Sequence, residues 1–214
     1  MERDKTAGQT RRRRADGERS RQAILRGAAS LATIDGLRGL SIGELAAHIG
    51  MSKSGLYAHF GSKEELQLAT VETAREIFDA EIVEPAQAIA DPLERLQALC
   101  EGFLSYLERR VFPGGCFFAS ATAELDTYPG PVKDAVASVQ QHWMDRLREL
   151  IRQAQEAGSL DSTETPVQLA FELEAYLLMG NSAFLLNDDP IPLEQARTAI
   201  RNRLARDAGR FVSA

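Results

Sequence analysis

The chain has 214 residues, of which 44% are hydrophobic and 26% are charged, as is usual for a soluble globular protein. No uninterrupted run of the ~18 apolar residues that a membrane span needs is present, and the arginine-rich N-terminus has no apolar signal core, so we expect a cytoplasmic protein. The two cysteines and three histidines stand at no metal-ligand spacing, which predicts neither a disulfide scaffold nor a metal site.

The net charge of −6 hides a basic head and an acidic remainder. Residues 1–63 hold 12 Lys and Arg against 6 Asp and Glu, whereas the rest of the chain holds 13 against 25. A basic head attracts phosphates and an acidic body repels them. This split favours a protein that presents one end to nucleic acid, and a well-mixed solvated surface is the alternative.

Residues 1–18 are polar and include four consecutive arginines, Arg11 to Arg14. So low an apolar content predicts a disordered basic arm. Such an arm either reaches into a narrow minor groove or acts as a solubilising tail with non-specific affinity for phosphates.

Two capping boxes open helices within one short stretch, residues 41–66. Ser41 with Glu44, and Ser62 with Glu65, have the S-x-x-E spacing in which both side chains satisfy free backbone N–H groups at a helix start. The stretch therefore predicts two helix starts with little chain between them.

A helix-turn-helix is predicted between these two starts. Apolar residues recur at helical spacing from Ile42 to Ile49, Gly50 supplies the left-handed residue that ends this helix, and Ser52 caps a second helix that runs to about His59. A short helix with an outward polar face suits the major groove of DNA.

This stretch resembles the helix-turn-helix of the TetR family of bacterial repressors. The resemblance is carried by Leu45-Ala46, Gly50-Met51-Ser52-Lys53, Leu56-Tyr57, His59-Phe60 and Ser62-Lys63-Glu64-Glu65-Leu66, and it extends back through a first helix from Arg21 to Gly36. It implies an all-α fold with an N-terminal three-helix DNA-binding domain and a C-terminal helical domain for ligand binding and dimerisation. The expected divisions are 1–18 for the arm, 19–66 for the DNA-binding domain, 67–84 for a connecting helix and 85–214 for the regulatory domain.

Eight residues of the helix-turn-helix are expected to contact DNA. Lys53 suits a phosphate or a guanine edge, and Tyr57 and His59 suit phosphates. Gly55 and Ala58 stand where the family often carries larger side chains, so a sequence-neutral architectural DNA-binding protein is the alternative. The predicted contacts are Ser41, Ser52, Lys53, Ser54, Gly55, Tyr57, His59 and Lys63.

The remaining chain predicts six further helices, which bring the total to about nine, and no run fits a strand. Pro85, the Pro113-Gly114-Gly115 turn and Gly158 mark helix ends, whereas Pro92 and Pro166 stand in first turns. The expected helices are 62 to about 84, 92 to about 112, about 116 to 125, 131 to about 157, 166 to about 186, and 192 onward.

The last two helices carry the predicted contacts with a second copy of the chain. The helix from residue 166 is apolar on nearly every side, so it needs partners on two faces. The resemblance implies the same homodimer, which reads a roughly palindromic operator. The predicted interface residues are Leu178, Ser182, Leu185, Ile200 and Leu204.

Aromatic side chains concentrate on the body helices, where a pocket for an apolar ligand is predicted. The resemblance implies a small-molecule inducer in this domain, and ordinary core packing is the alternative for each aromatic residue. The predicted ligand contacts are Phe103, Tyr106, Phe117, Glu124, Trp143 and Tyr176.

Together these features predict a transcriptional repressor that a small, largely apolar effector releases from DNA. No cofactor is expected, and we expect no enzyme. Two alternatives use Cys116, which opens a helix whose dipole favours a thiolate. The first is a redox or electrophile sensor, and the second is an enzyme with His142 as the base.

Overall fold

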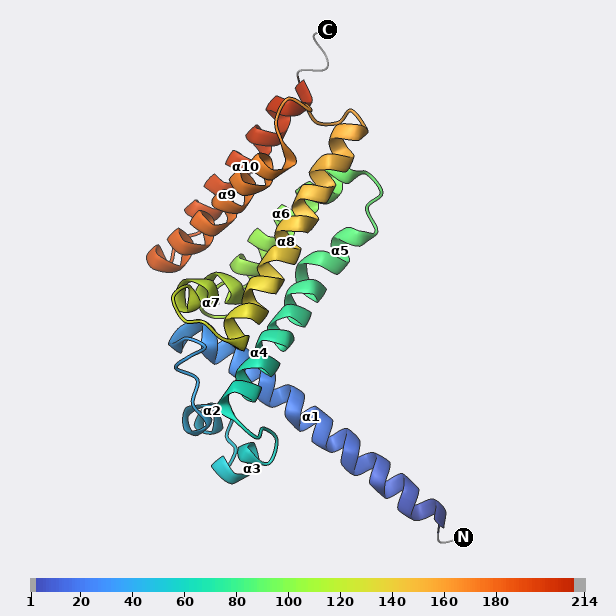
Figure 1. Ribbon diagram of the computed structural model, residues 1–214, viewed down its shortest axis with the longest axis vertical. Coiled ribbons are helices and arrows are strands. Elements are labelled where there is room, and N and C mark those ends of the chain that lie inside the picture. Colours follow the sequence, from blue (N-terminus) through green and yellow to red (C-terminus); the bar gives the residue numbers. More distant parts are fainter. Residues whose placement is uncertain (1–2, 210–214) are drawn as a thin grey trace.

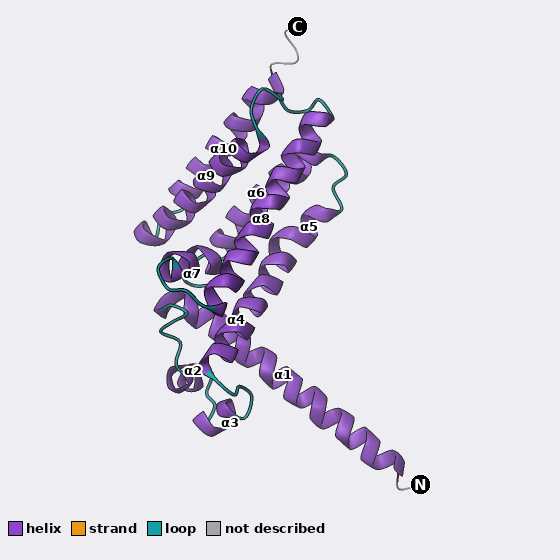
Figure 2. Ribbon diagram, viewed as in Figure 1, coloured by secondary structure: helices purple, strands orange, loops and turns teal. Residues whose placement is uncertain are grey.

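The computed structural model describes the backbone of residues 3–209 and the side chains of residues 17–205. Every regular element in this part of the chain is a helix, which confirms the predicted all-α class (Figures 1 and 2). The elements are α1 (Arg3–Asp35), α2 (Ile42–His48), α3 (Lys53–Tyr57), α4 (Lys63–Phe78), the π-helical turn η1 (Asp79–Val83), α5 (Glu84–Gln87), α6 (Pro92–Glu108), α7 (Phe117–Leu125), α8 (Pro131–Glu156), α9 (Pro166–Asn187) and α10 (Ile191–Gly209).

The prediction of a disordered arm is wrong for residues 3–18, because α1 begins at Arg3 (Figure 1). Residues 1 and 2 of that arm lie outside the described residues. The segment contains no proline and holds five arginines, a residue type that favours a helix. The packed part of α1 supplies the helix nucleus, so each preceding residue only extends an existing helix.

The helix that begins with α4 was predicted to end at Pro85, but it continues past this residue. The π-helical turn η1 follows α4 directly, and α5 then carries Pro85 in its first turn, where a missing N–H is tolerated. We call α4, η1 and α5 together the rod. Counted as one helix, the rod brings the described chain to the nine helices that the sequence predicts, and it joins the α2–α3 end of the molecule to the body (Figure 1).

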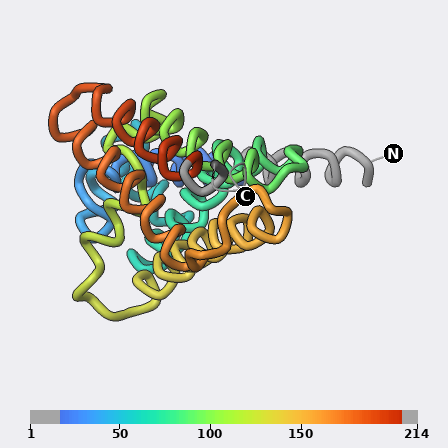
Figure 3. The backbone as a smooth tube through the Cα atoms, turned by 90° about the horizontal axis from the view of Figure 1, so that it is seen from above, coloured from blue at the N-terminus to red at the C-terminus, as the bar shows by residue number. Residues whose placement is uncertain are grey.

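The C-terminal helices α9 and α10 lie side by side, and α9 also packs on α6 and α8 (Figures 1 and 3). By length and composition α9 is apolar enough to cross a membrane, but 44% of its most apolar window is buried inside the molecule. Leu169, Leu173 and Leu177 are fully buried along its inner face. This helix is therefore the centre of the body's hydrophobic core.

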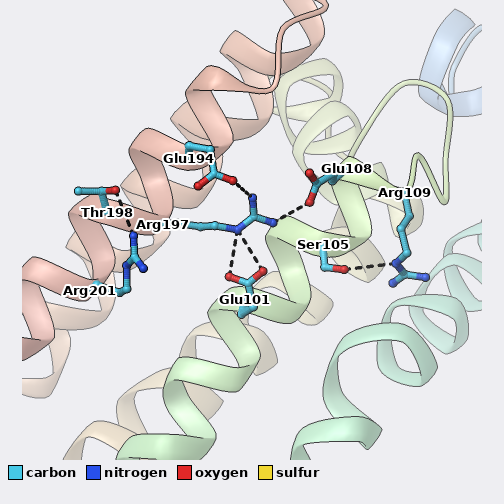
Figure 4. A network of polar contacts seen from close by, with 8 residues as sticks. All are labelled: Glu101, Ser105, Glu108, Arg109, Glu194, Arg197, Thr198 and Arg201. Carbon is cyan, nitrogen blue, oxygen red and sulfur yellow. Dashed lines mark hydrogen bonds and ion pairs between the residues drawn. The ribbon is translucent and has the colours of Figure 1, made fainter.

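A single arginine joins α10 to α6. The guanidinium of Arg197 contacts Glu101 at 3.0 Å and Glu108 at 2.8 Å, both on α6, and Glu194 at 2.6 Å on its own helix (Figure 4). Its side chain is 13% exposed, whereas each of the three carboxylates is more than half exposed. One mostly buried cation thus holds together three carboxylates that otherwise repel one another.

Replacing this arginine should destabilise the fold. We expect Arg197→Gln to lower the free energy of unfolding by about 1–3 kcal/mol, because three ion pairs are lost and the carboxylates are left facing each other. Urea unfolding measures the change, and added salt should reduce it. Arg201→Gln is the matched control, since Arg201 bonds only Thr198 at 3.4 Å. Equal stability of the wild type and Arg197→Gln would contradict the role given to Arg197.

Candidate functional site

The helix-turn-helix is built as the capping patterns predict. Ser41 accepts a hydrogen bond from the Glu44 backbone N–H at 3.1 Å, and Ser62 accepts one from Glu65 at 3.0 Å. Gly50 has a φ of +69°, the left-handed conformation that ends α2. These local bonds set the start and end of the first helix and the direction of the chain that enters α3.

The short helix α3 presents the predicted DNA-contacting side chains outward. Ser52 caps it by accepting from the Gly55 N–H at 3.1 Å, and Leu56 anchors its inner face with no exposed surface. Tyr57 is 62% exposed, and the side chain of Lys53 lies over Gly43 of α2. The short helix therefore turns one buried side to the head and a polar face to solvent.

The other predicted DNA contacts border this face. Ser54 is exposed, with its hydroxyl 3.3 Å from that of Ser52. His59 is partly buried, with its ring 6.4 Å from that of Phe60. Lys63 is exposed, and its ammonium donates to the Arg38 carbonyl at 2.5 Å. Lys63 thus already holds the turn before α2.

Glu124, which was predicted to contact a ligand, instead connects the body to the head. Its carboxylate accepts hydrogen bonds from the backbone N–H of Leu37 at 2.7 Å and of Arg38 at 2.8 Å. Both donors lie in the turn after α1, and the Arg38 guanidinium stacks 3.5 Å from the ring centroid of Tyr128. The prediction for Glu124 is therefore replaced by a structural role that no local sequence signal reveals, since 87 residues separate acceptor and donor.

A second contact fixes the same side of the head. The Gly114 N–H donates to the Thr33 hydroxyl at 3.0 Å, and a Cβ on Gly114 would lie 2.0 Å from the Thr33 carbonyl oxygen. Only glycine allows this approach of two backbones. The proline-glycine turn, predicted only as a helix end, is thus also a docking point between head and body.

Most of the predicted ligand contacts pack against one another instead of lining an open cavity. Phe78 lies at the centre of this cluster, with ring centroids 6.2 Å from Phe103, 6.2 Å from Tyr106 and 5.2 Å from Trp143. Phe117 is also buried, 2% exposed. For Phe103, Tyr106 and Phe117 the alternative of ordinary core packing is the one observed.

Two predicted ligand contacts remain at the edge of the core. Trp143 is 6% exposed and lines a hollow of about 300 Å³ between the rod and α8. Tyr176 is partly buried and packs against the core from α9. This hollow therefore lies beside the aromatic cluster and not within it.

Among the side chains that the structure describes, no cation contacts the buried carboxylate of Glu174. It accepts hydrogen bonds from the Trp143 indole N–H and from the Gln140 amide, each at 2.8 Å, and is 8% exposed. Burial raises the pKa of Glu174, and the two donors offset that rise only in part. The interior thus holds a group whose charged form is disfavoured.

Both cysteines are buried and unreactive in character. Burial raises the pKa of the Cys116 thiol to about 12 and that of Cys100 likewise to about 12. Cys116 does stand at the N-terminus of α7, but its backbone N–H donates to Asn181 and its side chain is 3% exposed. Desolvation therefore outweighs the helix dipole from which a reactive thiolate was inferred.

Two predicted dimer contacts are wrong. Ile200 is 4% and Leu204 1% exposed, because the apolar stripe of α10 faces the core of its own chain. Leu178 and Leu185 are partly buried, and Ser182 is exposed. Periodicity shows that a helix has an apolar face, but it does not tell which of two partners covers that face.

The outer face of α9 instead carries the exposed apolar side chains. Val167 is 59%, Phe171 64%, Met179 67% and Leu186 86% exposed. Large apolar groups gathered over one helix in this way are unusual on a monomer and mark an interaction surface. We call these four residues the α9 face.

A basic head with an outward short helix, carried on a helical body, defines a helix-turn-helix DNA-binding regulator. Residues 24–70 match the family model described as bacterial regulatory proteins, tetR family. Residues 92–200, about half of the chain, match the tetracyclin repressor-like C-terminal domain. The chain belongs to the TetR family of bacterial transcriptional regulators.

Individual relatives support this assignment. The transcriptional regulator AcuR of Cereibacter sphaeroides is 26% identical over 185 residues, which cover 82% of each chain. The crystal structure of a TetR regulator from Chloroflexus aurantiacus has a TM-score of 0.83 at 25% identity, over 90% of this chain and 98% of that one. AibR, in complex with isovaleryl coenzyme A and operator DNA, has a TM-score of 0.67 at 27% identity, over 84% and 95% of the two chains.

The raised pKa of Glu174 predicts a pH-dependent effect of its neutral analogue. A carboxyl group whose pKa is raised by folding stabilises the fold fully below its unfolded pKa, near 4.3, and loses that contribution as the pH rises through the folded pKa. We therefore expect Glu174→Gln to melt at a higher temperature than the wild type at neutral pH. The difference should shrink as the pH falls through the raised pKa.

Thermal melts from neutral to acidic pH test this expectation. Glu76→Gln, which neutralises an exposed glutamate of the rod, is the control and should leave the pH profile unchanged. A Glu174→Gln protein that is less stable than the wild type at neutral pH would show that Glu174 is ionised and favourably so.

Proposed function

We propose that the chain is a homodimeric repressor that binds a roughly palindromic operator in the bacterial cytoplasm and is released by a small-molecule effector. The observation that carries the proposal is the outward polar face of α3 on a head of positive charge. Two such heads on a two-fold dimer reach successive major grooves, about 34 Å apart or somewhat more.

The α9 face supports the dimer. It is apolar, it runs along a helix of 22 residues, and α10 and α8 already cover the other sides of α9. A second copy of the same face buries it by symmetry. We therefore place the α9 face at the centre of the interface, with Ser182 close to the axis as a small residue that permits close approach.

A small-molecule effector is supported by one relative. The structure of AibR contains both isovaleryl coenzyme A and operator DNA. In the present chain the body has hollows beside the aromatic cluster, and the rod leads from them to the helix-turn-helix. An effector releases DNA only if it binds one arrangement of the two heads more tightly than the other.

An enzyme based on Cys116 and His142 has no support in the geometry. Cys116 is buried at the start of α7, whereas His142 is exposed on α8 and its Nδ1 contacts the Ser138 carbonyl at 2.6 Å. The described residues also hold no cluster of His, Cys, Asp and Glu of the kind that binds a metal ion. We assign the chain a binding function and no catalytic one.

DNA binding is tested with the DNA that flanks the gene. Lys53→Ala should weaken binding by about 1–3 kcal/mol and relax the preference at one operator position, whereas His59→Ala should weaken all duplexes alike. Gel shifts at fixed salt measure both, with Arg201→Ala as a control for loss of a distant positive charge. Equal binding of random duplex and flanking DNA by the wild type would instead favour the architectural alternative that Gly55 and Ala58 suggest.

The dimer is tested by placing charge on the α9 face. Phe171→Glu combined with Met179→Glu should convert the protein to a folded monomer, because two apolar groups that the partner would bury become charged. Sedimentation gives the mass and circular dichroism the helix content. Ile34→Glu is the control, since Ile34 is 60% exposed on α1. A double variant that remains dimeric would place the interface elsewhere.

A further inference from the structure

A groove runs between the rod and α8 and continues toward α6. It consists of two adjoining hollows of about 300 and 350 Å³, which share Val83, His142 and Arg146 in their linings. Phe78, Val139 and Trp143 give the first hollow an apolar floor. We call the two hollows together the rod groove, and its size is that of a site for a small molecule.

The two carboxylates that line the rod groove, Asp79 and Glu149, already take part in ion pairs within the chain. Asp79 is held by Arg75 at 2.5 Å, and Glu149 by Arg152 at 2.6 Å. The same Arg152 lowers the pKa of Glu149 to about 2. Both carboxylates of the groove therefore have a guanidinium partner, and Arg75 also contacts Glu72 and Arg152 also contacts Glu156.

Arg146 differs from the other cations of the body. Among the lysines and arginines of residues 64–205, whose side chains the structure describes, it alone makes neither a hydrogen bond nor an ion pair. The guanidinium of Arg95 adds to it in the second hollow, where it bonds only a backbone carbonyl. Unneutralised positive charge thus lies beside an apolar floor, in a part of the chain that is otherwise strongly acidic.

The wall of the rod groove is the least regular part of the rod. Asp79 and Val83, the two ends of the π-helical turn η1, both line the first hollow. Single π-helical turns inside α-helices occur frequently at functional sites. The same rod begins at Lys63, a few residues after α3 ends at Tyr57, so a molecule wedged against η1 presses on the support of the DNA-binding head.

We propose that the rod groove binds an amphipathic anion, with Arg146 holding its charged end and Phe78, Val139 and Trp143 contacting its apolar chain. A cation is excluded by like charge, and a neutral alcohol leaves Arg146 without a partner. The proposal rests on the proposed function only in one respect, that the bound anion is the effector. Binding itself is independent of DNA.

Trp143 is the chain's only tryptophan, so its fluorescence reports binding in the rod groove. Octanoate, octanol and octylammonium share a chain and differ in charge, and calorimetry gives their affinities independently. We expect octanoate to bind most tightly and to perturb Trp143. Octanoyl coenzyme A, which carries the same chain on a phosphate-bearing group, distinguishes a free acid from its thioester as the source of the anion.

Variants locate the site. Arg146→Gln should weaken octanoate binding about five- to tenfold while leaving octanol unchanged. Val139→Phe should fill the first hollow and reduce binding of every octyl compound. Arg201→Gln, which removes an exposed arginine of α10 that does not line the groove, is the control and should bind like the wild type.

The proposal is overturned if octanol or octylammonium binds as tightly as octanoate, or if Arg146→Gln leaves octanoate binding unchanged. It is also overturned if none of the anions perturbs Trp143 in a folded protein. Gel shifts without any ligand separate this failure from failure of the proposed function, because operator binding in the absence of octanoate tests the repressor alone.

Discussion

The carboxylate of Glu124 is the interaction on which the arrangement of head and body depends. It accepts hydrogen bonds from two backbone N–H groups in the turn after α1. Nearby, the Gly114 N–H donates a hydrogen bond to the Thr33 hydroxyl. The rod attaches the head at its other side, through α4. The head is therefore held at two points, by Glu124 on one side and by α4 on the other.

The cations of the body and those of the head have different surroundings. In the acidic body, most arginines already contact carboxylates, and Arg197 alone contacts three. The head keeps Lys53 exposed, as the proposed contact with DNA requires. The exceptions are therefore informative: Arg146 is a cation without a partner, and Glu174 is a buried carboxylate held only by neutral donors. Both are close to Trp143, because Arg146 lines the same hollow as Trp143 and Glu174 accepts a hydrogen bond from its indole N–H.

The helix α9 explains why the body is both a core and an interface. Its inner leucines are fully buried against α6, α8 and α10, and its outer side presents Phe171 and Met179 to solvent. A helix that is apolar on every side has no amphipathic stripe, so its sequence is also compatible with a membrane span. Packing on one side and the proposed dimer contact on the other account for the same composition.

Sequence by itself determined the elements that depend on contacts three or four residues apart. The serine caps, the glycine that ends α2, the helix-turn-helix and the number of helices follow from such local bonds, and they were predicted. The partners of those elements were decided by tertiary structure. Glu124 binds a turn 87 residues away, Ile200 and Leu204 face their own core, and the aromatic residues close on Phe78. A periodic pattern fixes which face of a helix is apolar, but only the packed fold decides what that face meets, because burial is non-directional and many partners satisfy it equally.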